Sequence, residues 1–291
     1  MGSESYCFDV GNYKCTLISD GTFSYPHPTK NVFINFFVNA QKEQLERVLR
    51  DHKLDPEQWE EYVSPYICLA IDTGKENVLV DTGAGNFAPT TGRLIPRLKA
   101  EGISPEDIDT VILTHAHPDH IGGTINNENK PAYPNAKYVM WKDEWDFWIN
   151  KPDLSRLGID EHAKETLVNF AQSNLRLIEE QLELVDHETE IRPGINIISA
   201  TGHTPGHIAV KIFSDDSQLY HVSDTVLHPI HLEKPKWCSS VAYNSQNVTA
   251  TRHKLLNKVA EEKAQMVASH FPFPGLGNLT KKEDGWQWHP I

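Results

Sequence analysis

Three histidines and one aspartate near the middle of the chain have the residue types and spacing of a metal site. The run reads T-H-A-H-P-D-H-I-G-G over residues 114–123. Neutral imidazole and carboxylate are ligands that zinc and similar divalent ions accept. Pro118 fixes its own φ and helps the backbone to turn, so the polar side chains around it can point into one space. Taken alone, the run has a second interpretation as a solvated polar turn. The candidate ligands here are His115, His117, Asp119 and His120.

Three more candidate ligands stand later in the chain, each just after a segment expected to be a buried strand. They are His203 after residues 196–199, Asp224 after residues 218–222 and His270 after residues 266–268. A catalytic metal needs three protein ligands and an open position, so the first run is too large for one such site and too small for two. Each later residue also has a simpler interpretation, as a hydrogen-bonded core histidine or a capping aspartate.

The elements that must position these residues occur in two blocks with the same order of strands and helices. Predicted strands cover residues 15–18, 32–38, 66–71, 77–80, 110–113, 196–199, 209–213, 218–222 and 266–268. Predicted helices cover residues 41–53, 93–100, 160–182 and 249–264. Turns are expected at Asp20-Gly21 and at residues 72–75, the latter closing a hairpin. Runs of strands with helices between the runs favour two packed sheets over a doubly wound parallel sheet. No Pro/Gly/Ser-rich linker divides the chain, which predicts one domain over residues 1–291.

Composition and charge disfavour some classes of partner for the protein. Of 291 residues, 39% are hydrophobic and 23% are charged, as in an ordinary globular protein. The formal net charge of -13 disfavours nucleic acid, because binding to phosphates depends on Lys and Arg. The longest apolar stretches are far shorter than the ~20 residues of a membrane span, so no membrane is expected. The four Cys are scattered and the N-terminus does not look like a secretory signal, which predicts a cytoplasmic location.

The motifs and their order resemble the metallo-β-lactamase superfamily along essentially the whole chain. The resemblance implies an α/β fold, an αββα sandwich of two packed mixed β-sheets with helices on both outer faces. It also implies two metal ions, the first held by His115, His117 and His203, the second by Asp119, His120 and His270, with Asp224 bridging them. Asp119 and Asp224 would then have catalytic roles. Asp81 would accept a hydrogen bond from a ligating His, although a plain turn residue is the alternative.

Within the superfamily, the chain most resembles the branch that contains methyl parathion hydrolase and related lactonases. The similar segments are D-G-T at 20–22, L-V-D-T-G at 79–83, G-R-L at 92–94 and H-F-P-F-P-G-L-G at 270–277. Quorum-quenching lactonases usually place a Tyr three residues after the bridging Asp, whereas this chain has Leu227. The neighbouring His228 is either a pocket residue or a surface residue. The aromatic segment 141–148 is interpreted as core, with a substrate cleft as the alternative, and Phe271 and Phe273 are candidates for the cleft.

The resemblance implies a binuclear metal-dependent hydrolase. A metal-bridging hydroxide would open a lactone or cleave an ester, and promiscuous organophosphate hydrolysis is a further expectation. Zinc is the first choice of metal, and Mn, Co or Fe would suit the same ligands. A homodimer is suggested by the family alone. One alternative is a thioester hydrolase of the glyoxalase II kind, disfavoured because only 21 residues follow His270. The other is a non-catalytic, metal-dependent binding module.

Overall fold

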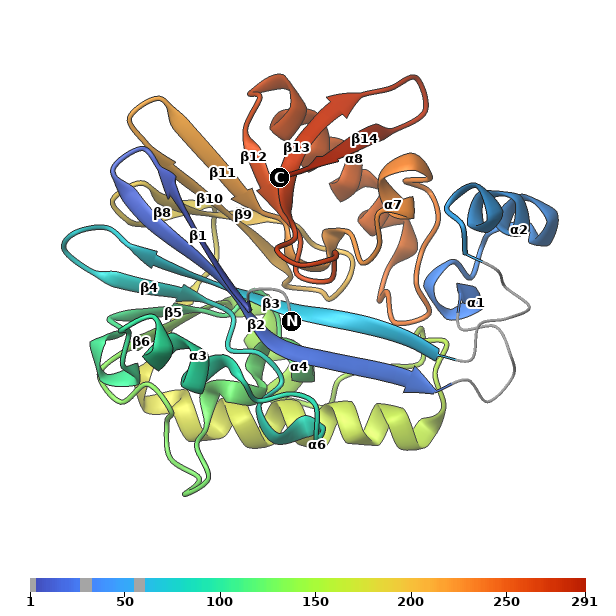
Figure 1. Cartoon of the computed structure of the whole chain (residues 1–291). Helices are drawn as coiled ribbons and strands as arrows, with labels where there is room; N and C mark the ends of the chain where they lie inside the picture. The colour runs from blue at the N-terminus through green and yellow to red at the C-terminus, as the bar shows by residue number, and fades with distance from the viewer. Residues whose placement is uncertain (1–3, 27–32, 55–60) are drawn as a thin grey trace.

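The computed structural model describes residues 4–26, 33–54 and 61–291, and these residues contain two seven-stranded sheets (Figure 1). The first sheet has the order β1-β2-β3-β4-β5-β6-β7, with parallel pairing from β4 to β7 and antiparallel pairing elsewhere. Its strands are β1 (Ser5–Val10), β2 (Tyr13–Pro26), β3 (Glu61–Asp72), β4 (Asn77–Val80), β5 (Thr110–Ile112), β6 (Lys137–Trp141) and β7 (Leu182–Val185).

The second sheet has the order β14-β13-β12-β11-β10-β9-β8 and is also mixed, because β11 and β12 pair in parallel while the other pairs are antiparallel. Its strands are β8 (Thr189–Arg192), β9 (Ile195–Ser199), β10 (Ile208–Ser214), β11 (Ser217–His221), β12 (Gln265–Val267), β13 (Leu276–Lys281) and β14 (Trp286–Pro290). Each sheet therefore carries one of the two blocks expected from the sequence.

The two-residue period of the strands builds a three-part core. In β4, Val78 and Val80 face the second sheet, while Leu79 faces the opposite way. In β10, Val210 points into the same layer between the sheets and Ala209 points outward. Because strands of both sheets contribute to the middle cluster, the sheets pack face to face, as in a sandwich.

Helices cover both outer faces of this sandwich. Helices α3 (Leu94–Ala100) and α6 (Glu161–Ile178) pack on the first sheet, and α8 (Ser245–Glu261) packs on the second. Figure 1 shows α6 running along the face of the first sheet that is turned away from the second. The predicted αββα sandwich is thus confirmed. The shorter helices are α1 (Phe33–Phe36), α2 (Lys42–Asp51), α4 (Pro118–Ile121), α5 (Lys142–Ile149) and α7 (Ile230–Glu233).

Two local predictions are wrong. The apolar run 32–38 was expected to be a strand, but α1 occupies Phe33–Phe36, and Phe37 packs with α2 and Trp237; residue 32 lies outside the described residues. Periodicity alone cannot distinguish a short buried strand from a helix. The turn at Asp20-Gly21 is instead a bulge inside β2, because the Asp20 carboxylate is occupied with backbone N–H groups of the loop beside it.

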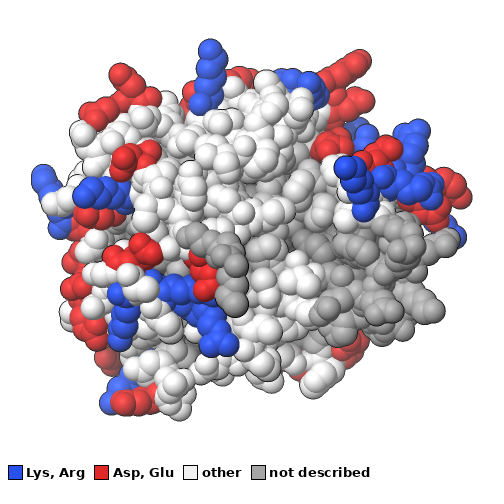
Figure 2. Space-filling view, viewed as in Figure 1, with Lys and Arg blue, Asp and Glu red and all other residues white. Residues whose placement is uncertain are grey.

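The predictions about nucleic acid and membranes can be compared with the charges on the surface and with the lengths of the helices. On the face shown in Figure 2, Lys and Arg side chains lie next to Asp and Glu side chains in small groups, with uncharged surface between the groups. Among the described residues, we find no helix with both the length and the apolar character that crossing a bilayer requires. The single domain over residues 1–291 stays a prediction.

Asp20 is expected to be a main anchor of the loop that follows β4. Its buried carboxylate accepts hydrogen bonds from the backbone nitrogens of Ala84, Gly92 and Leu94 at 2.8, 3.1 and 2.9 Å. Asp20→Ala leaves three donors without an acceptor, so we expect the free energy of unfolding to fall by about 3 kcal/mol in urea titrations. The control Asp72→Ala, at an exposed turn, should cost less than about 1 kcal/mol. Equal losses in the two variants would contradict this role.

Candidate metal centre

The structure brings all seven predicted ligands together at one edge of the sandwich. His115 and His117 follow β5, and Asp119 and His120 lie in the single turn of α4. The remaining three come from the second sheet: His203 after β9, Asp224 in the 3₁₀ turn Ser223–Thr225 after β11, and His270 after β12. Strand ends from two sheets meet here, which is why residues far apart in the sequence become neighbours.

The first cluster consists of His115, His117, His203 and Asp224, whose donor atoms lie within 4.8 Å of one another. Nδ1 of His117 lies 3.1 Å from Nε2 of His115 and 2.9 Å from Nε2 of His203. Oδ2 of Asp224 lies 3.0 Å from Nε2 of His203. Three ring nitrogens and one carboxylate oxygen therefore face a common buried point.

The second cluster consists of Asp119, His120 and His270, again within 4.8 Å. Oδ2 of Asp119 lies 3.6 Å from Nε2 of His120 and 3.4 Å from Nε2 of His270. Oδ1 of Asp224 lies 3.2 Å from the former nitrogen and 3.0 Å from the latter. Asp224 thus turns one oxygen to each cluster.

The electrostatics of the two clusters suit cations. Burial, together with the neighbouring imidazoles, holds the pKa of His115 and of His117 well below the usual value, so both rings are neutral near pH 7 and could ligate a metal. Burial lowers the pKa of His120 as well, but the carboxylates of Asp224, Asp119 and Asp81 outweigh it and raise the pKa. Nε2 of His120 is buried and makes no hydrogen bond within the described part of the chain. A buried nitrogen left without a bond, facing two carboxylates, is the arrangement that a metal ion satisfies.

Neighbouring groups fix the orientation of the imidazoles. Asp81 accepts a hydrogen bond from Nδ1 of His120 at 2.7 Å, which confirms the contact predicted for it. The other oxygen of Asp81 accepts from the backbone nitrogen of Thr114 at 2.8 Å. Nδ1 of His270 donates to the carbonyl of Pro65 at 3.0 Å. In both rings Nε2 is left to face the cluster, as metal ligation requires.

His207 positions Asp224, a role that the sequence did not assign. The backbone nitrogen of Asp224 donates to Nε2 of His207 at 3.1 Å, and Nδ1 of His207 donates to the carbonyl of Ala200 at 2.9 Å. Burial lowers the pKa of His207 to about 3, which keeps the ring neutral and able to accept. The sequence feature that could have indicated this role is the position of His207 at the end of the G-H-T-P-G-H turn.

A cavity of about 410 Å³ opens directly above the two clusters. Its floor includes His117, Asp119, His203, Asp224 and His270. Its walls are mostly apolar and come from segments far apart in the chain. The apolar wall residues are Phe23, Phe36, Tyr66, Phe87, Pro118, Ile159, Ala163, Leu167, Leu227 and Val241.

The aromatic residues predicted for the cleft are wrong, because neither Phe271 nor Phe273 lines the cavity. Leu227 does line the cavity, but His228 instead packs its ring against Phe37, with the ring centroids 5.8 Å apart. The two outermost Trp residues of segment 141–148, Trp141 and Trp148, are buried, which confirms the core interpretation for them. Phe271 is also buried in the core and is therefore not part of the cleft. Phe273 packs against the cluster between the sheets.

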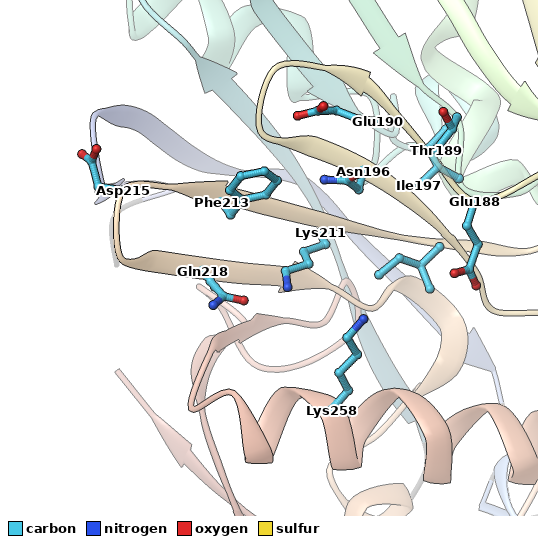
Figure 3. Close-up of a pocket in the computed structure, with 11 residues that line it drawn as sticks. Glu188, Thr189, Glu190, Asn196, Ile197, Lys211, Phe213, Asp215, Gln218 and Lys258 are labelled. Carbon is cyan, nitrogen blue, oxygen red and sulfur yellow. The ribbon is translucent and has the colours of Figure 1, made fainter.

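A second groove, of about 510 Å³, lies on the outer face of the second sheet between its strands and α8 (Figure 3). Its lining is polar and charged, and Lys258 extends from α8 toward the strand that carries Lys211. Lys211 is already paired with Glu262 at 2.8 Å. None of the seven candidate ligands lines this groove, so the cavity above the clusters is the candidate active site.

Comparison with known proteins agrees with this geometry. The profile of the metallo-beta-lactamase superfamily matches residues 65–270, a span that contains all seven candidate ligands. The chain therefore belongs to the metallo-beta-lactamase superfamily.

Relatives within the superfamily include lactonases. An N-acyl homoserine lactonase from Bacillus sp is 25% identical over 173 residues, covering 53% of this chain and 60% of the relative's own length. The lactonase AiiB of Agrobacterium fabrum (strain C58 / ATCC 33970) is 24% identical over 223 residues, covering 73% of this chain and 72% of AiiB. Among solved structures, AidC, a dizinc quorum-quenching lactonase in complex with a product, N-hexnoyl-L-homoserine, superposes with a TM-score of 0.89. The two chains are 30% identical, and the superposition covers 99% of this chain and 97% of AidC.

Asp81→Asn is expected to weaken metal binding at the second cluster. The amide oxygen is needed by the backbone nitrogen of Thr114, so the amide NH₂ would face Nδ1 of His120. That nitrogen must then accept, which moves the ring proton to Nε2 and blocks ligation. We expect a loss of about 10- to 100-fold in the affinity for one ion, measured by competition with a chromogenic chelator. Unchanged affinity, relative to the exposed control Asp72→Asn, would contradict the assignment.

Proposed function

We propose that the chain is a metal-dependent hydrolase that holds two divalent ions and opens a lactone or cleaves an ester. The observation that carries the proposal is the pair of clusters joined by Asp224, each carboxylate oxygen facing one cluster. Support also comes from the lactonase relatives and from AidC, which is described as a dizinc lactonase. Zinc is the first metal to test, followed by Mn, Co and Fe.

The residues that would hold the ions are those that the family resemblance implies. His115, His117 and His203 would hold one, Asp119, His120 and His270 the other, and Asp224 both. When bound, such a pair would lower the pKa of a shared water, so that hydroxide is available near neutral pH, and would polarise the substrate oxygen. The side chain of Asp119 in the second cluster is 15% exposed, whereas His115 and His203 of the first cluster are 0% and 3% exposed, so the second cluster is the more accessible from the cavity.

The cavity walls indicate the substrate. Phe23, Phe87 and Leu167 offer apolar surface for an acyl chain, and Asn35, Ser239 and Ser240 add polar groups to the lining of the cavity. Burial of an acyl chain also removes water from the reacting bond. Leu227 gives no phenol at the position where related lactonases carry Tyr, so help from a Tyr at that position is not part of the proposal.

Organophosphate cleavage is proposed as a secondary activity, because a phosphoryl oxygen can occupy the place of the carbonyl oxygen above the same clusters. The thioester hydrolase and the non-catalytic binding module stay as rivals. The homodimer, the cytoplasmic location and the absence of nucleic acid from the partners stay predictions.

Metal removal is expected to abolish hydrolysis reversibly. Protein purified without chelator should contain two metal ions per chain and hydrolyse acyl-homoserine lactones, dihydrocoumarin and aryl esters, with slower turnover of paraoxon. Dialysis against a chelator should abolish all of these activities, and Zn or Mn should restore them. Product chromatography beside calorimetry separates turnover from binding alone. Metal-loaded protein that is inert toward all four substrate classes, with or without tight binding, would contradict the proposal.

Phe87→Ala is expected to change the preference for acyl-chain length. The ring of Phe87 lies 5.6 Å from the rings of both Phe23 and Phe170, so truncation removes one side of the apolar wall. We expect kcat/KM for a decanoyl lactone to fall about tenfold, mainly through KM, with little change for a butanoyl lactone. The control Phe213→Ala, in the separate groove of Figure 3, should change neither value. A parallel loss for both chain lengths in Phe87→Ala would exclude an acyl-binding role.

A further inference from the structure

Glu144 is a fully buried carboxylate next to the metal centre that is not itself a candidate ligand. It lies in the first turn of α5 and has no exposed surface. Burying a carboxylate is costly unless hydrogen bonds compensate for the lost water, so its partners should reveal its role.

Each oxygen of Glu144 accepts two hydrogen bonds. Oε1 accepts from the backbone nitrogen of Ala116 at 2.9 Å and from Nε1 of Trp148 at 2.7 Å. Oε2 accepts from Oγ1 of Thr204 at 2.6 Å and from the backbone nitrogen of Gly206 at 2.9 Å. One carboxylate therefore holds the loop after β5 with one oxygen and the loop after β9 with the other.

These two loops carry the three histidines of the first cluster. Ala116 stands between His115 and His117, and Thr204 directly follows His203. The contact is close, because a Cβ at position 206 would lie only 2.2 Å from the backbone nitrogen of Glu144. The ring of Trp148 also packs edge-on against His117, with the ring centroids 5.7 Å apart.

The second cluster is held by other groups. His120 is oriented by Asp81, and His270 by the carbonyl of Pro65. The carbonyl of His120 also accepts from Thr82, through its nitrogen at 2.8 Å and its hydroxyl at 2.9 Å. None of the four hydrogen bonds that Glu144 accepts comes from these groups.

We propose that Glu144 is a positioning residue that fixes the spacing of His115, His117 and His203 and so sets the metal affinity of the first cluster alone. The inference rests on the proposed metal centre. Glu144 touches no reacting atom, and it acts through the two loops that it joins.

The chemistry of the four donors requires a carboxylate at this position. Three of them, the nitrogens of Ala116, Gly206 and Trp148, can only donate. Because at least one such N–H faces each oxygen, glutamine in either orientation would turn its NH₂ group toward an N–H. Glu144→Gln therefore keeps the volume of the side chain but loses the hydrogen bond from the backbone nitrogen of Ala116 or of Gly206, so its hold on one of the two loops is weakened.

The test compares Glu144→Gln with wild type and with Asp81→Asn, which acts on the other cluster. Stepwise zinc affinities are measured by chelator competition, and the coordination of cobalt-loaded protein is followed by its visible absorption. In Glu144→Gln we expect the affinity for one ion to fall about 10- to 100-fold while the other stays at the wild-type value. The double variant should then bind both ions weakly. Its affinity for one ion should fall as much as in Glu144→Gln, and its affinity for the other as much as in Asp81→Asn.

Matched variants make the result specific. Trp148→Phe keeps the ring against His117 and removes one donor that belongs to neither loop, so both affinities should stay within about threefold of wild type. Thr204→Val removes only the hydroxyl, and the affinity for the first ion should fall less than in Glu144→Gln. If Glu144→Gln does not fold, the zinc affinities of Thr204→Val and Trp148→Phe can be compared instead, because only the first variant removes a hydrogen bond to one of the two loops.

Three outcomes would overturn the inference. One is wild-type affinity for both ions in Glu144→Gln. Another is an equal loss of both ions in that variant while its metal-free form unfolds at the wild-type temperature. The third is a double variant that still binds one ion at full affinity, since Glu144 and Asp81 would then act on the same cluster. Wild-type protein that holds fewer than two ions would instead contradict the proposed function, on which this inference depends.

Discussion

The site depends on one buried carboxylate that faces two groups of histidines. Asp224 is 4% exposed, and its oxygens lie 3.0 Å from Nε2 of His203 on one side and from Nε2 of His270 on the other. Burial alone would raise the pKa of Asp224, but the surrounding imidazoles hold it well below the usual value. A charge this deeply buried needs positive partners, and two cations, one in each cluster, would supply them.

The rest of the fold serves to hold that arrangement. The two sheets pack through an apolar layer, so the strand ends of both halves meet at one edge. Hydrogen bonds then fix what packing leaves free: Asp81 orients His120, His207 holds the backbone of Asp224, and Glu144 joins the loops of the first cluster. The site is therefore positioned largely before any ligand binds, which limits the reorganisation needed during a reaction.

The seven residues of the clusters could be named from the sequence because they follow expected buried strands, whose ends meet at a sheet edge, and because their motifs resemble those of the metallo-β-lactamase superfamily. The sequence predicted the cavity poorly. Phe23, Phe36 and Phe87 come from separate segments with no shared motif, whereas Phe271, beside a ligand, turned out to be core. The short run at 32–38 has no period that separates strand from helix. Glu144 stood within a segment noticed only for its aromatic residues, because a buried carboxylate is recognisable only from its donors.

The most direct test is a crystal structure of the protein grown with zinc, with anomalous diffraction recorded at the zinc edge. We expect two peaks about 3.5–4 Å apart, with one oxygen of Asp224 on each. A single peak, or two peaks of which only one contacts Asp224, would contradict the claim that this carboxylate joins the two clusters into one centre.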